Sequence, residues 1–213
     1  VLADMLPEAG IAILSGPSFA KEIAHDLPCG VVLASADWSA AEEAARHIAN
    51  PHFCVHLSGD VVGAALGGVM KNVVAIASGI AHGRRLGENA RATIVTLGLE
   101  ESVRLGVAKG AKAETFLGLA GAGDFMLTAN SLQSRNTSLG VALGEGRKLA
   151  DILAGRRQVT EGAFSCEGAA ALARQLHVEV PLTDALDGVL NRGDDLDQAL
   201  DRFLHRLPPL YRR

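Results

Sequence analysis

The pattern of apolar and polar positions changes at about residue 60. Before it, three short apolar runs at residues 11–16, 30–35 and 53–58 have strand length and β-branched content, and turn residues bound them. Residues 37–50 begin with an Asp or Ser cap and repeat Ala at helical spacing. With a short helix after the first run, the order strand, helix, strand, helix, strand predicts the last part of an α/β sheet domain.

Beyond residue 60 the apolar runs become long and helical. They begin with residues 61–81 and 89–110, and shorter stretches follow at residues 113–119, 137–146, 148–155, 161–177, 182–191 and 195–207. Between them, the sequence AGAGDFMLTANSLQSRN (120–136) predicts a glycine-rich loop. We therefore expect an α/β remnant in residues 1–60 and an all-helical domain in residues 61–213.

The run at residues 61–81 is long enough to cross a membrane. Lys71 lies at its midpoint, where a charge costs roughly 2.5–3.5 kcal/mol on insertion scales. The run also contains four glycines and lacks basic or aromatic flanks. These features favour the core helix of a folded domain over a membrane span.

Composition narrows the classes of partner. The formal net charge of -4 gives no general attraction to nucleic acid or to anionic membranes. The three cysteines, Cys29, Cys54 and Cys166, lie far apart, with no CxxC pair and no histidine cluster at metal-ligand spacing. We therefore expect reduced thiols, a cytoplasmic protein and no metal site.

Lys71 and Asn72 are the first candidates for chemistry. A lysine inside an apolar run either extends its ammonium to the surface or holds it where it exchanges protons. Asn72 offers a donor and an acceptor, although adjacent helical positions point about 100° apart. From the pattern alone, a catalytic lysine and a lysine that reaches solvent at a helix kink both remain open.

Two further motifs can be interpreted either as ligand-binding sites or as helix caps. The turn GPSFA (16–20) follows a predicted strand and offers backbone N–H groups and the Ser18 hydroxyl to a ligand, or Ser18 as a helix cap. SRN (134–136) opens a helix and combines a guanidinium with a helix N-terminus, which suits a phosphate. Capping alone also explains Ser134 or Asn136.

Two acidic residues complete the candidates. Asp124 follows the glycines of AGAGD (120–124), either as a residue that receives a hydroxyl hydrogen bond or an ion pair from Lys71, or as a turn or cap residue. This motif lacks the G-x-G-x-x-G pattern of a dinucleotide-binding loop. Glu161 in QVTEG (158–162) occupies an ordinary acidic first-turn position of a helix.

Six motifs in a fixed order are much more specific than any one of them alone. They are LSGPSFAKEIA, VVGAALGGVMKNVVAIASGIAHG, GENARATIV, LAGAGDFMLT, SLQSRNTSLGVALGEG and QVTEG. Together they resemble the bacterial NAD(P)-dependent glycerol-3-phosphate dehydrogenases, over almost the whole chain. The resemblance implies a Rossmann-like domain followed by a helical substrate domain like the C-terminal domain of 6-phosphogluconate dehydrogenase. It also implies reversible reduction of dihydroxyacetone phosphate to sn-glycerol 3-phosphate by NAD(P)H, which supplies phospholipid synthesis.

The resemblance assigns roles by motif. Lys71 would be the general acid/base. The residues that would contact substrate, apart from Lys71, are Gly16, Ser18, Asn72, Asp124, Ser134, Arg135 and Asn136, and Asp124 would also orient Lys71. Those at the cofactor would be Ala20, Arg135, Val159 and Glu161. The implied partners are the small-molecule substrate and a second subunit in a homodimer, with no nucleic acid and no membrane span.

One part of the family pattern is missing. The family begins with a G-x-G-x-x-G strand–turn–helix, and this chain contains none. We therefore expect residues 1–60 to be the C-terminal part of the dinucleotide-binding domain, and the chain alone to be inactive.

Two other interpretations remain open. One is a related dehydrogenase with the same domain order, acting on a 3-hydroxyacid or on 6-phosphogluconate. The other is a non-catalytic helical module that serves dimerisation or regulation.

Overall fold

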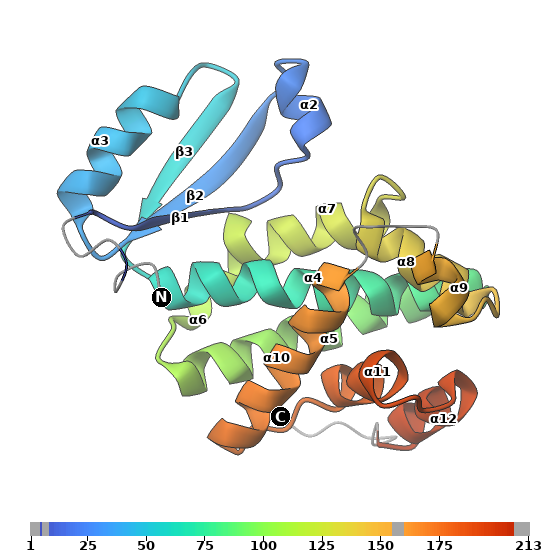
Figure 1. The fold of residues 1–213 in the computed structure, drawn as a ribbon. Helices are drawn as coiled ribbons and strands as arrows, with labels where there is room; N and C mark the ends of the chain where they lie inside the picture. Colours follow the sequence, from blue (N-terminus) through green and yellow to red (C-terminus); the bar gives the residue numbers. More distant parts are fainter. Residues whose placement is uncertain (1–4, 6–8, 155–159, 207–213) are drawn as a thin grey trace. The chain divides into compact units, whose positions relative to one another are not determined.

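The computed structural model describes residue 5 and residues 9–154 and 160–206 (Figure 1). The chain divides into two compact units. The first comprises Val1–Gly68 and Gly106–Leu127, and the second comprises Val69–Leu105 and Thr128–Arg213. The helices α4 (Val61–Gly83), α5 (Glu88–Lys109) and α7 (Asp124–Asn130) each contribute residues to both units.

The first unit contains a three-stranded sheet in the order β1 (Ala12–Ser15), β2 (Cys29–Ser35), β3 (Phe53–Ser58). The central strand β2 pairs antiparallel with β1 and parallel with β3. Two helices connect the strands: α2 (Ala20–Ala24) follows β1, and α3 (Trp38–Ile48) crosses over from β2 to β3 along one face of the sheet (Figure 1). The predicted order of strands and helices is confirmed.

The Asp60 carboxylate links the start of α4 to the segment that contains Lys112 and Thr115. One oxygen of its carboxylate accepts a hydrogen bond from the Gly63 N–H (2.9 Å) at the start of α4. The other accepts from the Lys112 N–H (2.8 Å) and the Thr115 hydroxyl (2.6 Å). Burial raises the pKa of Asp60, but these hydrogen bonds and the Lys112 charge outweigh it, so the pKa lies below its ordinary value.

The prediction of a loop over residues 120–136 is wrong. After α6 (Ala113–Leu117), the chain forms a π-helical turn, Leu119–Gly123, and then α7. The glycines allow close approach here: a Cβ on Gly121 would overlap the backbone of Phe116, and one on Gly67 would overlap the Ala120 carbonyl. The glycines therefore serve helix packing, because they remove the side chains that would keep these backbones apart.

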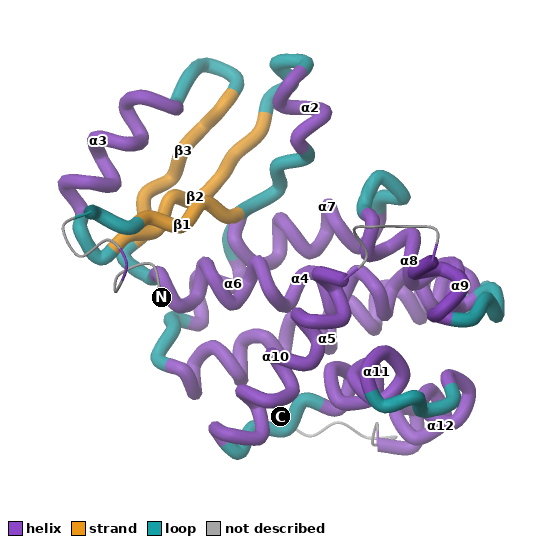
Figure 2. Tube along the Cα trace, viewed as in Figure 1, coloured by secondary structure: helices purple, strands orange, loops and turns teal. Residues whose placement is uncertain are grey.

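The described residues of the second unit are all helical or in connecting turns (Figure 2). Besides its parts of α4, α5 and α7, it contains α8 (Arg135–Gly144), α9 (Leu149–Ala154), α10 (Thr160–Leu176), α11 (Pro181–Asn191) and α12 (Leu196–Arg206). The chain thus has the predicted fold class, a short Rossmann-like α/β part followed by a mostly helical one.

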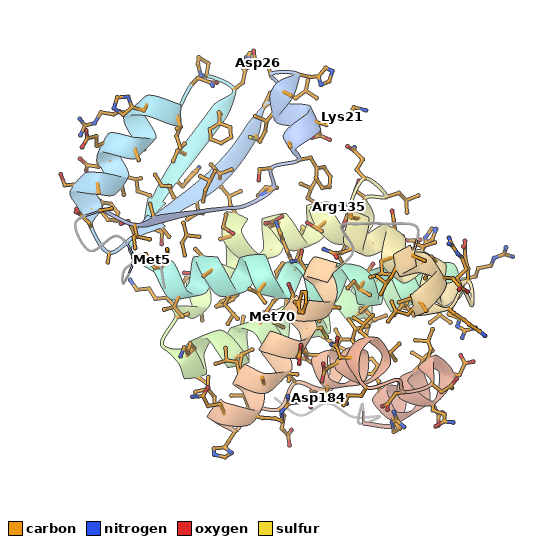
Figure 3. All side chains as sticks on the ribbon, in the orientation of Figure 1. Met5, Lys21, Asp26, Met70, Arg135 and Asp184 are labelled. Carbon is orange, nitrogen blue, oxygen red and sulfur yellow. The ribbon has the colours of Figure 1, made fainter. Side chains whose placement is uncertain are left out.

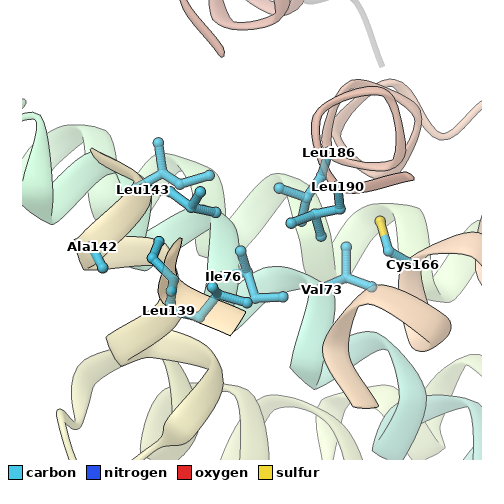
Figure 4. Close-up of a cluster of buried hydrophobic side chains, with 10 residues drawn as sticks. Val73, Ile76, Leu139, Ala142, Leu143, Cys166, Leu186 and Leu190 are labelled. Carbon is cyan, nitrogen blue, oxygen red and sulfur yellow. The ribbon is translucent and has the colours of Figure 1, made fainter. Parts of the chain in front are cut away.

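The core of the second unit surrounds α4. Figure 4 shows apolar side chains from four helices meeting there: Val73 and Ile76 of α4, Leu139, Ala142 and Leu143 of α8, Cys166 of α10, and Leu186 and Leu190 of α11. Helices α4 and α8 approach closely through glycines, since a Cβ on Gly79 would overlap the Thr137 carbonyl and one on Gly140 would overlap the Ile76 carbonyl. Glycines in α4 therefore bring α8 against it.

By length and composition, α4 alone among the described helices is long and apolar enough to cross a membrane. Most of its most apolar window (61%) is buried inside the structure. Such burial is typical of the core helix of a folded domain, which is what the sequence favoured over a membrane span.

Glu101 of α5 caps the start of α11. Its carboxylate is buried (1% exposed) and accepts hydrogen bonds from the Leu182 N–H (2.6 Å), the Thr183 N–H (3.1 Å) and the Thr183 hydroxyl (2.8 Å). Burial is the largest influence on this group and raises its pKa above the ordinary value of 4.5, although the hydrogen bonds oppose that shift. The first-turn amides of α11 therefore depend on a side chain from another helix.

We expect Glu101→Ala to lower the free energy of unfolding by about 3 kcal/mol, because it leaves two buried backbone N–H groups unsatisfied. Chemical denaturation measures this loss, with the exposed Glu167→Ala in the same unit as the control. A loss no larger than that of the control would contradict the capping role.

The raised pKa also predicts a pH dependence. A carboxyl group whose pKa is higher in the folded state binds its proton more tightly there, so its contribution to stability is fully present below the unfolded pKa. That contribution falls as pH rises through the folded pKa. Denaturation of wild type and Glu101→Gln from pH 4 to 7 should therefore show wild type losing stability relative to the variant as pH rises. An opposite trend would contradict the raised pKa.

Candidate active site

The second unit joins two of the predicted motifs through side chains. Asn72, next to Lys71 on α4, accepts a hydrogen bond through Oδ1 from Nδ2 of Asn136 on α8 (2.9 Å). Its Nδ2 donates to the Ser165 hydroxyl on α10 (3.2 Å). Lys71 itself is half-buried. The KN and SRN motifs therefore meet on neighbouring helices, through two asparagines that lie 64 positions apart in the sequence.

The SRN motif forms the beginning of α8. Ser134 is the N-cap, and its hydroxyl accepts a hydrogen bond from the Thr137 N–H (3.2 Å), so the capping interpretation of this serine is confirmed. Arg135 is the first helical residue, and its side chain is exposed at this end of the helix (Figure 3). A guanidinium beside a helix N-terminus attracts an anion through two independent sources of positive potential.

The first unit contains the candidates that follow β1. Gly16 has a φ of +128°, and a Cβ there would lie 3.2 Å from the Val31 Cα, so the turn requires glycine. The Ser18 hydroxyl donates to the Gly16 carbonyl (2.9 Å). The N-cap position of α2 is occupied by Phe19, so the alternative of Ser18 as the cap is wrong, and Ala20 is the first residue of that helix.

Ser15, the last residue of β1, was not among the predicted site residues. Its hydroxyl is buried (8% exposed for the residue) and has no hydrogen-bond partner in the described part of the chain. A Cβ on Gly68 would lie 3.7 Å from this oxygen, so α4 approaches it without covering it with a side chain. An orphaned hydroxyl beside the Gly16 turn is what a bound polar group would satisfy, and no spacing in the sequence marks it.

Three other predicted site residues, Asp124, Val159 and Glu161, lie elsewhere in the chain. Asp124 is buried (1% exposed) in the first unit, where it begins α7 directly after the π-helical turn. Val159 lies outside the described residues, and Glu161 lies in the first turn of α10 with its side chain outside them. Gly162 follows, and a Cβ on it would collide with Oδ1 of Asn136 and lie 2.7 Å from Ile76 Cδ1.

Comparison with protein families identifies the chain. A model described as NAD-dependent glycerol-3-phosphate dehydrogenase C-terminus matches residues 60–201, and the corresponding N-terminus model matches residues 1–41. The chain belongs to the NAD-dependent glycerol-3-phosphate dehydrogenase family. The resemblance inferred from the motifs is thus confirmed at the level of the family.

Curated members of this family are similar along nearly all of the chain. The glycerol-3-phosphate dehydrogenase [NAD(P)+] of Rhodospirillum rubrum is 48% identical over 97% of this chain, and that of Parvibaculum lavamentivorans is 45% identical over 97%. The chain spans 59% and 62%, respectively, of the lengths of these two relatives.

A solved structure of the family has the same fold. The crystal structure of glycerol-3-phosphate dehydrogenase from Coxiella burnetii aligns with a TM-score of 0.91 and 39% sequence identity. The alignment covers 96% of this chain and 63% of that one. A structure from Dunaliella salina, at 21% identity and a TM-score of 0.80, supports the fold alone.

The family name implies a nicotinamide cofactor, and the residues of the first unit fit one. NAD(P)H carries ribose hydroxyls and a carboxamide, which need hydrogen-bonding partners and room beside the backbone. The unpartnered Ser15 hydroxyl supplies such a hydrogen-bonding partner. The described part of the chain offers no cluster of three or more His, Cys, Asp or Glu for a metal ion.

Proposed function

We propose that the protein catalyses the reversible, NAD(P)H-dependent reduction of dihydroxyacetone phosphate to sn-glycerol 3-phosphate. The observation that supports this most is the Asn136–Asn72 hydrogen bond, because it joins the motif with the candidate proton donor to the motif with the candidate phosphate site. A phosphorylated ketone needs both, one at its carbonyl and one at its anionic end. Membership of the family supports the same reaction.

Lys71 is the general acid/base in this proposal. Reduction turns the ketone oxygen into an alkoxide unless a proton arrives, and the Lys71 ammonium donates that proton to the carbonyl oxygen. In the reverse direction, the neutral amine takes the proton from the hydroxyl. Asp124 is a further substrate residue in this proposal, and the Asn72 amide fixes the direction of the substrate oxygens.

The anionic end of the substrate binds at the beginning of α8. The Arg135 guanidinium pairs with the phosphate through parallel N–H donors, and the α8 N-terminus adds backbone donors. Ser134 keeps that helix end in place through its cap, and Asn136 contributes a further donor. Gly16 and Ser18 are further substrate residues in this proposal.

The cofactor residues in this proposal are Ala20, Arg135, Val159 and Glu161. When bound, NAD(P)H supplies the hydride that reaches the carbonyl carbon. The protein's own task is to orient the ketone and to deliver the proton.

The wider biology is part of the same proposal. Residues 1–60 belong to the dinucleotide-binding domain and residues 61–213 to the substrate domain, which is supported by the start of the C-terminal family match at residue 60. The protein acts as a cytoplasmic homodimer that supplies phospholipid synthesis, and the 213-residue chain alone is inactive.

A substrate panel tests the function. We expect the full-length protein to oxidise NADPH or NADH with dihydroxyacetone phosphate at an ordinary enzymatic rate. It should oxidise glycerol 3-phosphate in reverse. Turnover of a 3-hydroxyacid or 6-phosphogluconate in their place would favour a related dehydrogenase. The absence of turnover and of stabilisation by either phosphorylated compound would contradict the proposal.

A further inference from the structure

We infer that one face of α10, formed by Gly162 and Ser165, positions the Asn72–Asn136 pair for catalysis. The inference rests on the proposed function and adds two positioning residues to it. Residues three apart on a helix lie on the same side, so Gly162 and Ser165 face the pair together. Their contacts with the two asparagines are independent of each other, which makes each one testable alone.

Ser165 acts on Asn72. An asparagine amide has an oxygen that accepts and a nitrogen that donates, and these ends exchange places when the amide turns over. The Ser165 hydroxyl accepts the Nδ2 hydrogen at 3.2 Å. Because a hydroxyl can also donate, this contact fixes the amide together with the Asn136 donor on its other side. The Oδ1 end then faces α8, where the Asn136 amide donates to it at 2.9 Å.

Gly162 acts on Asn136. An added Cβ at this position would collide with the Asn136 Oδ1. Since the colliding atom is at the end of a side chain, Asn136 would rotate, and its Nδ2 would turn away from Asn72. The absence of a side chain at Gly162 therefore leaves the space in which Asn136 holds its orientation.

The consequence for catalysis follows from where the pair lies. Asn72 is adjacent to Lys71, and Asn136 is adjacent to Arg135. A fixed pair keeps the amide groups in one orientation between the proton donor and the phosphate site. Without the α10 contacts the Asn72 amide samples both orientations, and in one of them it presents the wrong end to the substrate.

A double-mutant cycle tests the role of Ser165. We expect Ser165→Ala in the full-length protein to lower kcat about tenfold with the KM for the cofactor unchanged, because one orienting hydrogen bond is lost. The lost hydrogen bond and the higher helix propensity of alanine oppose each other, so thermal stability should change little. In an Asn72→Ala background the same substitution should have no further effect, and Ser165→Thr should retain most of the wild-type kcat.

Gly162→Ala tests the other contact, with Gly168→Ala as the matched control on α10, where an added Cβ meets nothing within 4 Å. Both substitutions replace a glycine in the same helix. Gly168→Ala should preserve or raise stability, whereas the Gly162→Ala Cβ also meets Ile76 Cδ1 at 2.7 Å, so kcat is compared at a temperature at which denaturation curves show both variants folded. Gly162→Ala alone should lower kcat. Equal kcat in the two variants would overturn the role of Gly162.

A readout without turnover separates this inference from the proposed function. In the amide NMR spectrum of the full-length protein, Ser165→Ala should shift the Asn72 and Asn136 side-chain resonances, whereas Thr96→Ala on α5 should not. Unchanged resonances, or a Ser165→Ala effect that persists in the Asn72→Ala background, would overturn the inference. Wild-type inactivity with the resonance shift would overturn the proposed function, and the catalytic part of this inference with it, while the Ser165 contact to the pair would stand.

Discussion

Lys71→Ala should lower kcat for dihydroxyacetone phosphate by about 10²–10⁴-fold, the range over which a positioned general acid contributes. The physical reason is that the alkoxide formed by hydride arrival has lost its proton donor. Binding of the cofactor does not depend on that proton, so its dissociation constant changes little. Steady-state kinetics and a cofactor titration of the full-length protein measure both quantities.

The control for this substitution is Lys148→Ala, which removes an exposed lysine in the same unit. It tests whether the loss of any ammonium from the helical unit slows the enzyme. We expect its kcat to equal that of wild type. If Lys71→Ala retains the wild-type kcat, Lys71 has no part in the proton transfer.

Arg135→Ala should raise the KM for dihydroxyacetone phosphate about 10- to 150-fold, since a charge-assisted hydrogen bond contributes about 1.5–3 kcal/mol. The effect should depend on the phosphate. With unphosphorylated dihydroxyacetone, which has no anion for the guanidinium to bind, kcat/KM of the variant and of wild type should be similar when each is measured at saturating cofactor.

Arg147→Ala, at an exposed position just after α8, is the matched control for a lost guanidinium. Arg135→Lys should recover only part of the affinity, because an ammonium lacks the paired donors of a guanidinium. Equal losses with the phosphorylated and the unphosphorylated ketone would contradict a phosphate role for Arg135.

Much of the fold could be predicted from local patterns. Strand-length apolar runs gave β1, β2 and β3, and the cap at Asp37, whose carboxylate accepts from the Ala40 N–H (3.0 Å), marked the start of α3. The π-helical turn was missed because glycine has a low local preference for helix. Its packing role at Gly121 depends on Phe116 and is invisible to a local pattern.

The sequence motifs predicted individual residues of the candidate site, but not which of those residues contact one another. The motifs named Asn72 and Asn136, yet no spacing indicates that two residues 64 positions apart share a hydrogen bond. Ser165 lies 93 positions from Asn72 and stands in an ordinary helical stretch, so its contact emerges only from the packing of α10 on α4. Ser15 was missed because an unpartnered hydroxyl is a property of its surroundings.

The transfer of deuterium from the cofactor to the substrate carbon tests the central claim most directly. The full-length protein would be incubated with dihydroxyacetone phosphate and NADPH carrying deuterium at the transferable position. We expect glycerol 3-phosphate with one deuterium at C2, identified by mass and by NMR, in wild type but only in trace amounts with Lys71→Ala. Unlabelled product, or none from wild type, would contradict the account.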